Sequence, residues 1–145
     1  MVVKMDLPKK LRFVLLFLKE ANEVKGKTKF QKMFFLLNEE EKIQTGHKFV
    51  KYTYGPYSSE LSNDLDALKQ FEFIEVGKSL FNTNSDFVGK QFEYKLTESG
   101  KELIEQSNDF TKEEIKKTKK IISEWNNKEL PEIIEYVYGK YMPRK

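Results

Sequence analysis

The chain has 145 residues, a length that fits one domain, and 39% of its residues are hydrophobic while 34% are charged. It contains no cysteine, which excludes disulfides, thiolate metal sites and thiol catalysis. The net charge of +3 is modest for a dedicated nucleic-acid binder, and no apolar run reaches the roughly 20 residues of a membrane-spanning helix. We expect a soluble, cytoplasmic protein with no signal peptide, no cofactor and no bound metal.

The first two predicted helices are apolar on more than one side. Leucine and valine spacing predicts a helix over Leu7–Asn22, and a second helix is predicted from Thr28, its capping residue, to about Gln44. The side chains that exceed a single core-facing stripe are Phe13, Leu16, Phe17, Phe35 and Leu36. Because helices that are apolar on most sides are buried centrally or at interfaces, part of this surface is predicted to meet a second copy or another protein.

A strand, a turn and a third helix are predicted next. Phe49–Tyr54 alternates as a short strand, and the following Gly55-Pro56 predicts a turn. The third helix, Ser58–Phe71, is predicted to start at a serine cap, Ser58 or Ser59. We expect Gly55, Pro56 and Tyr57 to form a structural motif in which Tyr54 and Tyr57 pack against neighbouring helices.

The second half of the chain predicts a hairpin and further helices. Strands over Phe73–Ser79 and Gln91–Leu96 enclose a polar loop, and a fourth helix follows from Thr97 to about Gln106. A capping box at Thr111 opens another helix, and Pro131 starts the last one. The order predicts one α+β, mostly helical domain over residues 1–145. Its winged helix-turn-helix core covers about 7–106 and includes a two-stranded wing hairpin, and a C-terminal helical extension covers about 111–142.

Three segments carry a family resemblance: KTKFQKMFFLL at 27–37, YTYGPYSSELSNDLDAL at 52–68 and YKLTESGKEL at 94–103. They resemble the Panacea domain, also called SocA-like, and the related YwgA-like proteins; YVYGKYMP at 136–143 resembles the closing helix of that family. The resemblance implies an antitoxin that neutralises a toxin by direct contact, or an adaptor to a protease. The sequence departs from the family at Glu72, where such helices usually have glycine. A left-handed backbone there costs a non-glycine residue roughly 1 kcal/mol.

The outer face of the third helix is the candidate contact surface. At 100° per residue, the face opposite Leu61, Leu65 and Leu68 carries Ser59, Glu60, Asn63, Asp66 and Gln70. DNA affinity rests largely on lysine and arginine, whereas this face has two carboxylates and no base, so it predicts recognition of a protein. An ordinary solvated face is the alternative, and serine, asparagine and glutamine can also read bases.

The remaining candidate functional residues are lysines and the single histidine. Lys78, Lys90 and Lys95 on the hairpin are the candidate phosphate contacts for weak DNA binding. Lys69 is predicted at the edge of the core, and His47 at the surface or in a loop. With one histidine, no cysteine and no glycine-rich phosphate loop, the residues favour no catalytic site. Two functions stay open: a non-enzymatic protein-binding module, or a winged-helix transcription regulator.

Overall fold

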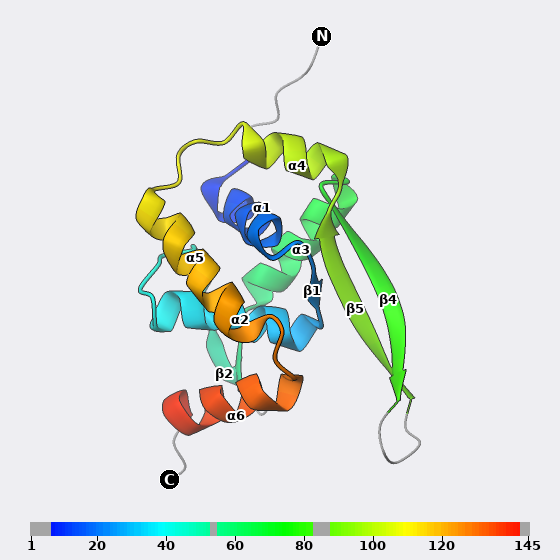
Figure 1. The fold of residues 1–145 in the computed structure, drawn as a ribbon, viewed down its shortest axis with the longest axis vertical. Helices are drawn as coiled ribbons and strands as arrows, with labels where there is room; N and C mark the ends of the chain where they lie inside the picture. Colours follow the sequence, from blue (N-terminus) through cyan, green and yellow to red (C-terminus); the bar gives the residue numbers. More distant parts are fainter. Residues whose placement is uncertain (1–6, 53–54, 83–87, 143–145) are drawn as a thin grey trace.

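The computed structural model describes residues 7–52, 55–82 and 88–142, and of residues 79–82 and 88–90 it describes the backbone alone. The described part is mixed α+β and mostly helical (Figure 1). Its elements are α1 (Lys9–Ala21), β1 (Val24–Lys25), α2 (Lys27–Glu39), β2 (Val50–Tyr52), β3 (Gly55–Tyr57), α3 (Ser59–Gln70), β4 (Ile74–Asn82), β5 (Val88–Leu96), α4 (Glu98–Glu105), α5 (Lys112–Trp125) and α6 (Leu130–Tyr141). Within the described ranges, every helix is too short or too polar to cross a bilayer.

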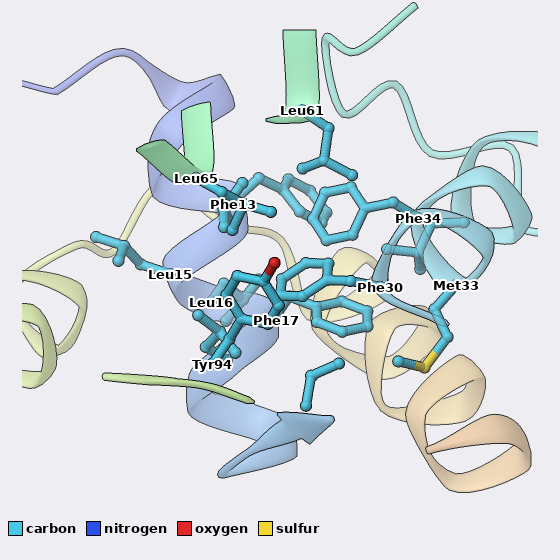
Figure 2. Packing of buried hydrophobic residues seen from close by; sticks show 14 of the residues in the cluster. Phe13, Leu15, Leu16, Phe17, Phe30, Met33, Phe34, Leu61, Leu65 and Tyr94 are labelled. Atoms are coloured by element: carbon cyan, nitrogen blue, oxygen red, sulfur yellow. The ribbon is translucent and has the colours of Figure 1, made fainter. Parts of the chain in front are cut away.

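Helices α1 and α2 form the centre of the core. Their phenylalanine rings pack in tilted pairs (Figure 2): the ring centre of Phe17 lies 4.9 Å from that of Phe34 and 5.4 Å from that of Phe30. The five side chains from which we predicted an interface are all buried within the single chain, with exposures between 0% and 8%. The fold itself therefore explains, without an interface, why both helices are apolar on several sides.

The predicted hairpin is confirmed, and it belongs to a three-stranded sheet. Strands β4 and β5 pair antiparallel along their whole length, and β1 pairs with the other edge of β5, which gives the order β1-β5-β4. The far end of the hairpin extends away from the helices (Figure 1). Strand β1 is only two residues long, so its sequence has too little alternation to reveal it.

Helix α2 begins and ends earlier than predicted. It follows Gly26, whose φ is +103°, and Thr28 does not cap it. It ends at Glu39 instead of Gln44, because Lys42 adopts φ +57° and the Ile43 N–H donates to the carbonyl of Leu37 at 3.0 Å. The bond from Ile43 and the left-handed backbone of Lys42 turn the chain back against the end of the helix.

The Gly-Pro turn prediction is wrong. Gly55 and Pro56 lie in β3, which pairs antiparallel with β2 so that Tyr52 faces Gly55 and Val50 faces Tyr57. The expected turn therefore does not lie at Gly55-Pro56, and the expected contact of Tyr54 falls outside the described residues. The ring of Tyr57 lies 5.6 Å from the ring of Tyr52, across the ribbon.

The start and end of α3 follow the local sequence signals. The Ser58 hydroxyl accepts the Leu61 N–H at 3.0 Å, which confirms one of the two predicted caps. Glu72, after the helix, has φ +63°, the left-handed conformation that glycine would adopt at lower cost. The capping box at Thr111 and the proline in the first turn of α6 are also present.

Candidate recognition surface

Two polar residues of α2 hold the segment that leads into α3. The Gln31 amide accepts the Ser58 N–H at 2.8 Å and donates to the Ser58 carbonyl at 2.9 Å. The next residue, Lys32, donates from Nζ to the Pro56 carbonyl at 3.1 Å. Both side chains are buried, so α2 fixes both ends of the Pro56–Ser58 segment and with it the first turn of α3.

Lys32 shows why the strand needs its glycine. A Cβ at position 55 would lie 3.0 Å from Cε of Lys32, and Gly55 has φ +107°, so a side chain there would be both crowded and strained. Burial lowers the pKa of Lys32 to about 8, since the interior disfavours the charged ammonium group. Among the described residues, no carboxylate lies within ion-pairing distance of this amine.

His47 lies in the loop after α2, one of the two predicted settings, but it is buried and not at the surface. Its Nε2 lies 2.7 Å from Oδ2 of Asp64, and its Nδ1 lies 3.1 Å from the hydroxyl of Thr45. A hydroxyl, an imidazole and a carboxylate in line have the composition of a catalytic triad. The imidazole, however, has an exposed side-chain fraction of 0%, and Thr45 is 2% exposed. A substrate cannot reach the hydroxyl, and the three groups tie the loop after α2 to α3.

Acidic side chains on one flank of α3 bond to other segments of the same chain. Glu60 accepts the Lys48 N–H at 2.7 Å, and its other oxygen lies 3.4 Å from Nζ of Lys10 on α1. The bond from Lys48 holds the pKa of Glu60 below its usual value. Asp64, one turn further along α3, is the carboxylate that contacts His47. Its Oδ2 also lies 3.9 Å from Nζ of Lys10. Glu60, which we predicted as a member of the contact face, is therefore engaged by its own chain, although its side chain is 43% exposed.

The other four predicted contact residues form the exposed stripe of α3. Ser59, Asn63, Asp66 and Gln70 follow one another at helical spacing, and all four are exposed. Asp66 is the single charge on this stripe, and the described residues place no cation in ion-pairing distance of it. The stripe keeps the polar, slightly acidic character that the sequence predicted.

A narrow groove separates the stripe from the hairpin. It encloses about 110 Å³, and its lining comprises Lys27, Ser62, Leu65, Asp66, Lys69, Val76, Phe92 and Tyr94. Lys69 is exposed beside this groove, which corrects its predicted place at the core edge. The Tyr94 phenol is mostly buried, and its pKa is raised to about 12, chiefly by burial and then by the negative charge of Asp66. Sequence reasoning missed this groove because its two walls come from distant segments.

The hairpin offers less free positive charge than its lysines suggest. Lys95 lies 3.3 Å from Glu75 on the neighbouring strand, and Lys78 is exposed, with its Nζ 5.6 Å from the ring centre of Phe92. The side chain of Lys90 is outside the described part. Among the described side chains, Lys78 is thus the predicted phosphate contact that has no carboxylate beside it.

The described residues contain no cluster of three or more histidine, aspartate or glutamate side chains able to hold a metal ion. Comparison with known proteins adds no relative: no family model, curated protein or solved structure matches the chain. Any assignment of function thus depends on the geometry above and on the resemblance of the sequence motifs.

Proposed function

We propose that the chain is a non-enzymatic binding module of the Panacea-like type, an antitoxin or adaptor that acts by direct contact with a protein. The observation that carries the proposal is the exposed stripe of α3, whose four side chains are polar and whose single charge, Asp66, is acidic. A partner surface with a basic group opposite Asp66 fits this stripe, because complementary charge favours encounter and specificity. A toxin-like protein or a protease is the partner class that the motif resemblance implies, and the cytoplasm is the compartment that we propose for both.

The position of the Thr45, His47 and Asp64 side chains supports a binding role over an enzymatic one. Thr45 and His47 are buried, and their bonds to each other and to Asp64 hold the loop after α2 against α3. Lys32, the described lysine whose pKa falls to about 8, is also enclosed and bonded to a backbone carbonyl. These groups stabilise the scaffold that presents the stripe.

A winged-helix transcription regulator is the second candidate, and one observation favours it. The element order, with β1 pairing on β5 and a long β4–β5 hairpin beside α3, resembles a winged-helix arrangement. Two observations oppose it. Residues 40–58, including the β2–β3 ribbon, separate α2 from α3, whereas DNA-reading helix pairs are joined by a tight turn. Lys95, one of the two hairpin lysines whose side chains are described, is also paired with Glu75.

The test compares Asp66→Lys with a matched charge reversal, Glu102→Lys, on the exposed face of α4. Each variant and the parent chain are used to capture proteins from extract of the native cell, and each is titrated with a random-sequence DNA duplex. We expect Asp66→Lys to lose the protein captured by the parent and to bind the duplex more tightly, while Glu102→Lys keeps the protein. Tight binding of one DNA sequence by the parent chain, lost on Asn63→Ala or Gln70→Ala, would overturn the proposal in favour of the regulator.

A further inference from the structure

The β2–β3 ribbon has one covered strand and one exposed strand. Gly55 and Pro56 in β3 are buried, and this strand packs against α2 and α6. All three residues of β2 are exposed, and Val50 (42%) and Tyr52 (56%) are among the most exposed large hydrophobic side chains in the described part of the chain. In the view of Figure 1 the label β2 stands between α2 and α6. The contacts of β3 with both helices place β3 against the body, so β2 forms the outer edge.

The register shows which backbone groups of β2 are free. Antiparallel pairs alternate between pairs that exchange two backbone hydrogen bonds and pairs that exchange none. Lys51 lies opposite Pro56, and proline has no N–H, so this pair is of the second kind. The N–H and C=O of Lys51 therefore point away from β3, toward the outer edge, where a further strand could pair with them.

The side chains at this edge indicate what the further strand carries. The side chain of Lys51 is exposed, and no described carboxylate lies within ion-pairing distance of it or of nearby Lys48. Val50 and Tyr52 point to the opposite face, where the ring of Tyr57 adjoins that of Tyr52. An incoming strand thus meets a positive charge on one face and an apolar, aromatic surface on the other.

A second copy of this chain fits the edge poorly. Two β2 strands related by a two-fold axis through Lys51 would place one lysine directly opposite the other, and like charges in that position destabilise a pair. A carboxylate in the same position would be attracted. We propose that the outer edge of β2 binds an extended segment of a partner protein by strand addition, with an aspartate or glutamate opposite Lys51 and apolar side chains next to it. This surface is separate from the α3 stripe and would operate whichever class of molecule binds there.

The experiment uses the full chain and two end-blocked synthetic peptides, Thr-Ser-Val-Glu-Val-Ser-Thr and the same peptide with lysine in place of glutamate. Binding is followed by NMR titration of the ¹⁵N-labelled protein and by amide hydrogen exchange. We expect the glutamate peptide to bind roughly fivefold more tightly than the lysine peptide, as expected from cross-strand charge pairs, and to slow exchange of the Lys51 amide.

Charge-swapped variants sharpen the result. Lys51→Glu should reverse the preference between the two peptides, and Lys51→Gln should abolish it. Asp66→Lys, on the α3 stripe, should leave both affinities unchanged, which separates this proposal from that of α3 recognition. Equal binding of the two peptides, binding of neither, or an unchanged Lys51 amide would overturn the proposal. Protection of that amide without peptide, together with dimers in sedimentation, would assign the edge to a second copy instead.

Discussion

Helices α2 and α3 are neighbours in the chain and nearly equal in length, yet the fold uses them in opposite ways. In α2, nine consecutive residues from Lys29 to Leu37 are buried, and these include two lysines and a glutamine. In α3, only Leu61, Leu65 and Leu68 are buried, and the polar side chains of the stripe face outward. Polar composition therefore does not distinguish an exposed helix from a core helix in this protein; the neighbours of each helix do.

The buried polar groups of α2 are bonded to backbone. Lys29 donates to the Asn126 carbonyl at 2.9 Å, Gln31 bonds both backbone groups of Ser58, and Lys32 bonds the Pro56 carbonyl. These bonds join α2 to the turn that precedes α6 and to the Pro56–Ser58 segment. Each of them replaces hydrogen bonds to water that the side chain loses on burial. We therefore expect the same type of substitution to lower the free energy of unfolding more in α2 than in α3.

The largest difference is expected for phenylalanine. Phe34 on α2 is fully buried, and rings of Phe17, Phe30 and His47 lie within 5.6 Å of its ring centre. Phe34→Ala should lower the free energy of unfolding by about 3–5 kcal/mol, because it removes a large side chain and leaves a cavity. Phe71→Ala, at the end of α3 where the ring is 48% exposed, should cost less than about 1 kcal/mol.

Denaturant unfolding of the two variants, followed by circular dichroism, measures both values. Equal losses for the two phenylalanines would contradict the assignment of α2 as the core helix and of the α3 end as surface.

The second difference concerns lysine and pH. The pKa of Lys32 is about 8 in the folded chain and about 10.5 when unfolded, so between these values the unfolded state binds more protons. Lys32 therefore makes the parent chain more stable as pH rises from about 8 to 10.5, by an amount on the order of 3 kcal/mol. Lys32→Met removes this dependence, so its advantage over the parent should be greatest near pH 7 and should shrink toward pH 10.5.

Urea unfolding at a series of pH values measures the dependence, with Lys69→Met on the exposed side of α3 as the control. The control curve should run parallel to that of the parent. If the stability of Lys32→Met also ran parallel to that of the parent across this pH range, Lys32 would have to be solvated in the folded chain.

The smallest of the three differences is expected for the amides. Gln31→Ala leaves the buried N–H of Ser58 without its acceptor, and an unsatisfied buried donor costs about 1–3 kcal/mol. Asn63→Ala, on the exposed stripe of α3, should change the free energy of unfolding by no more than about 0.5 kcal/mol. Thermal unfolding of both variants compares them, and a loss in Asn63→Ala as large as that in Gln31→Ala would place Asn63 in an internal contact.

Local signals predicted the elements that depend on near neighbours in the chain. Helix α3 begins at Ser58 because a hydroxyl there satisfies the N–H three residues on, and the capping box at Thr111 works in the same way. The leucine spacing of α3 was enough to assign its outer stripe, and four of the five predicted contact residues are exposed. These features need no information about what packs against the helix.

Other features depend on partners distant in the chain. Nothing near Glu60 in the sequence indicates that the Lys48 N–H and Lys10 will engage it, and nothing near His47 indicates Asp64. The run FQKMFF could have suggested buried polar groups, since α2 has apolar residues all round and Gln31 and Lys32 have no polar face to join.

The sequence by itself determined the order of the helices, the β4–β5 hairpin and the polar character of the α3 stripe, because helix caps, apolar periodicity and strand alternation act over a few residues. Only the tertiary structure decided that α1 and α2 are covered by their own chain, that Gly55 and Pro56 form a strand, and that β2 has an exposed edge. These outcomes arise from contacts between segments far apart in the chain, where burial and hydrogen bonding outweigh local preference.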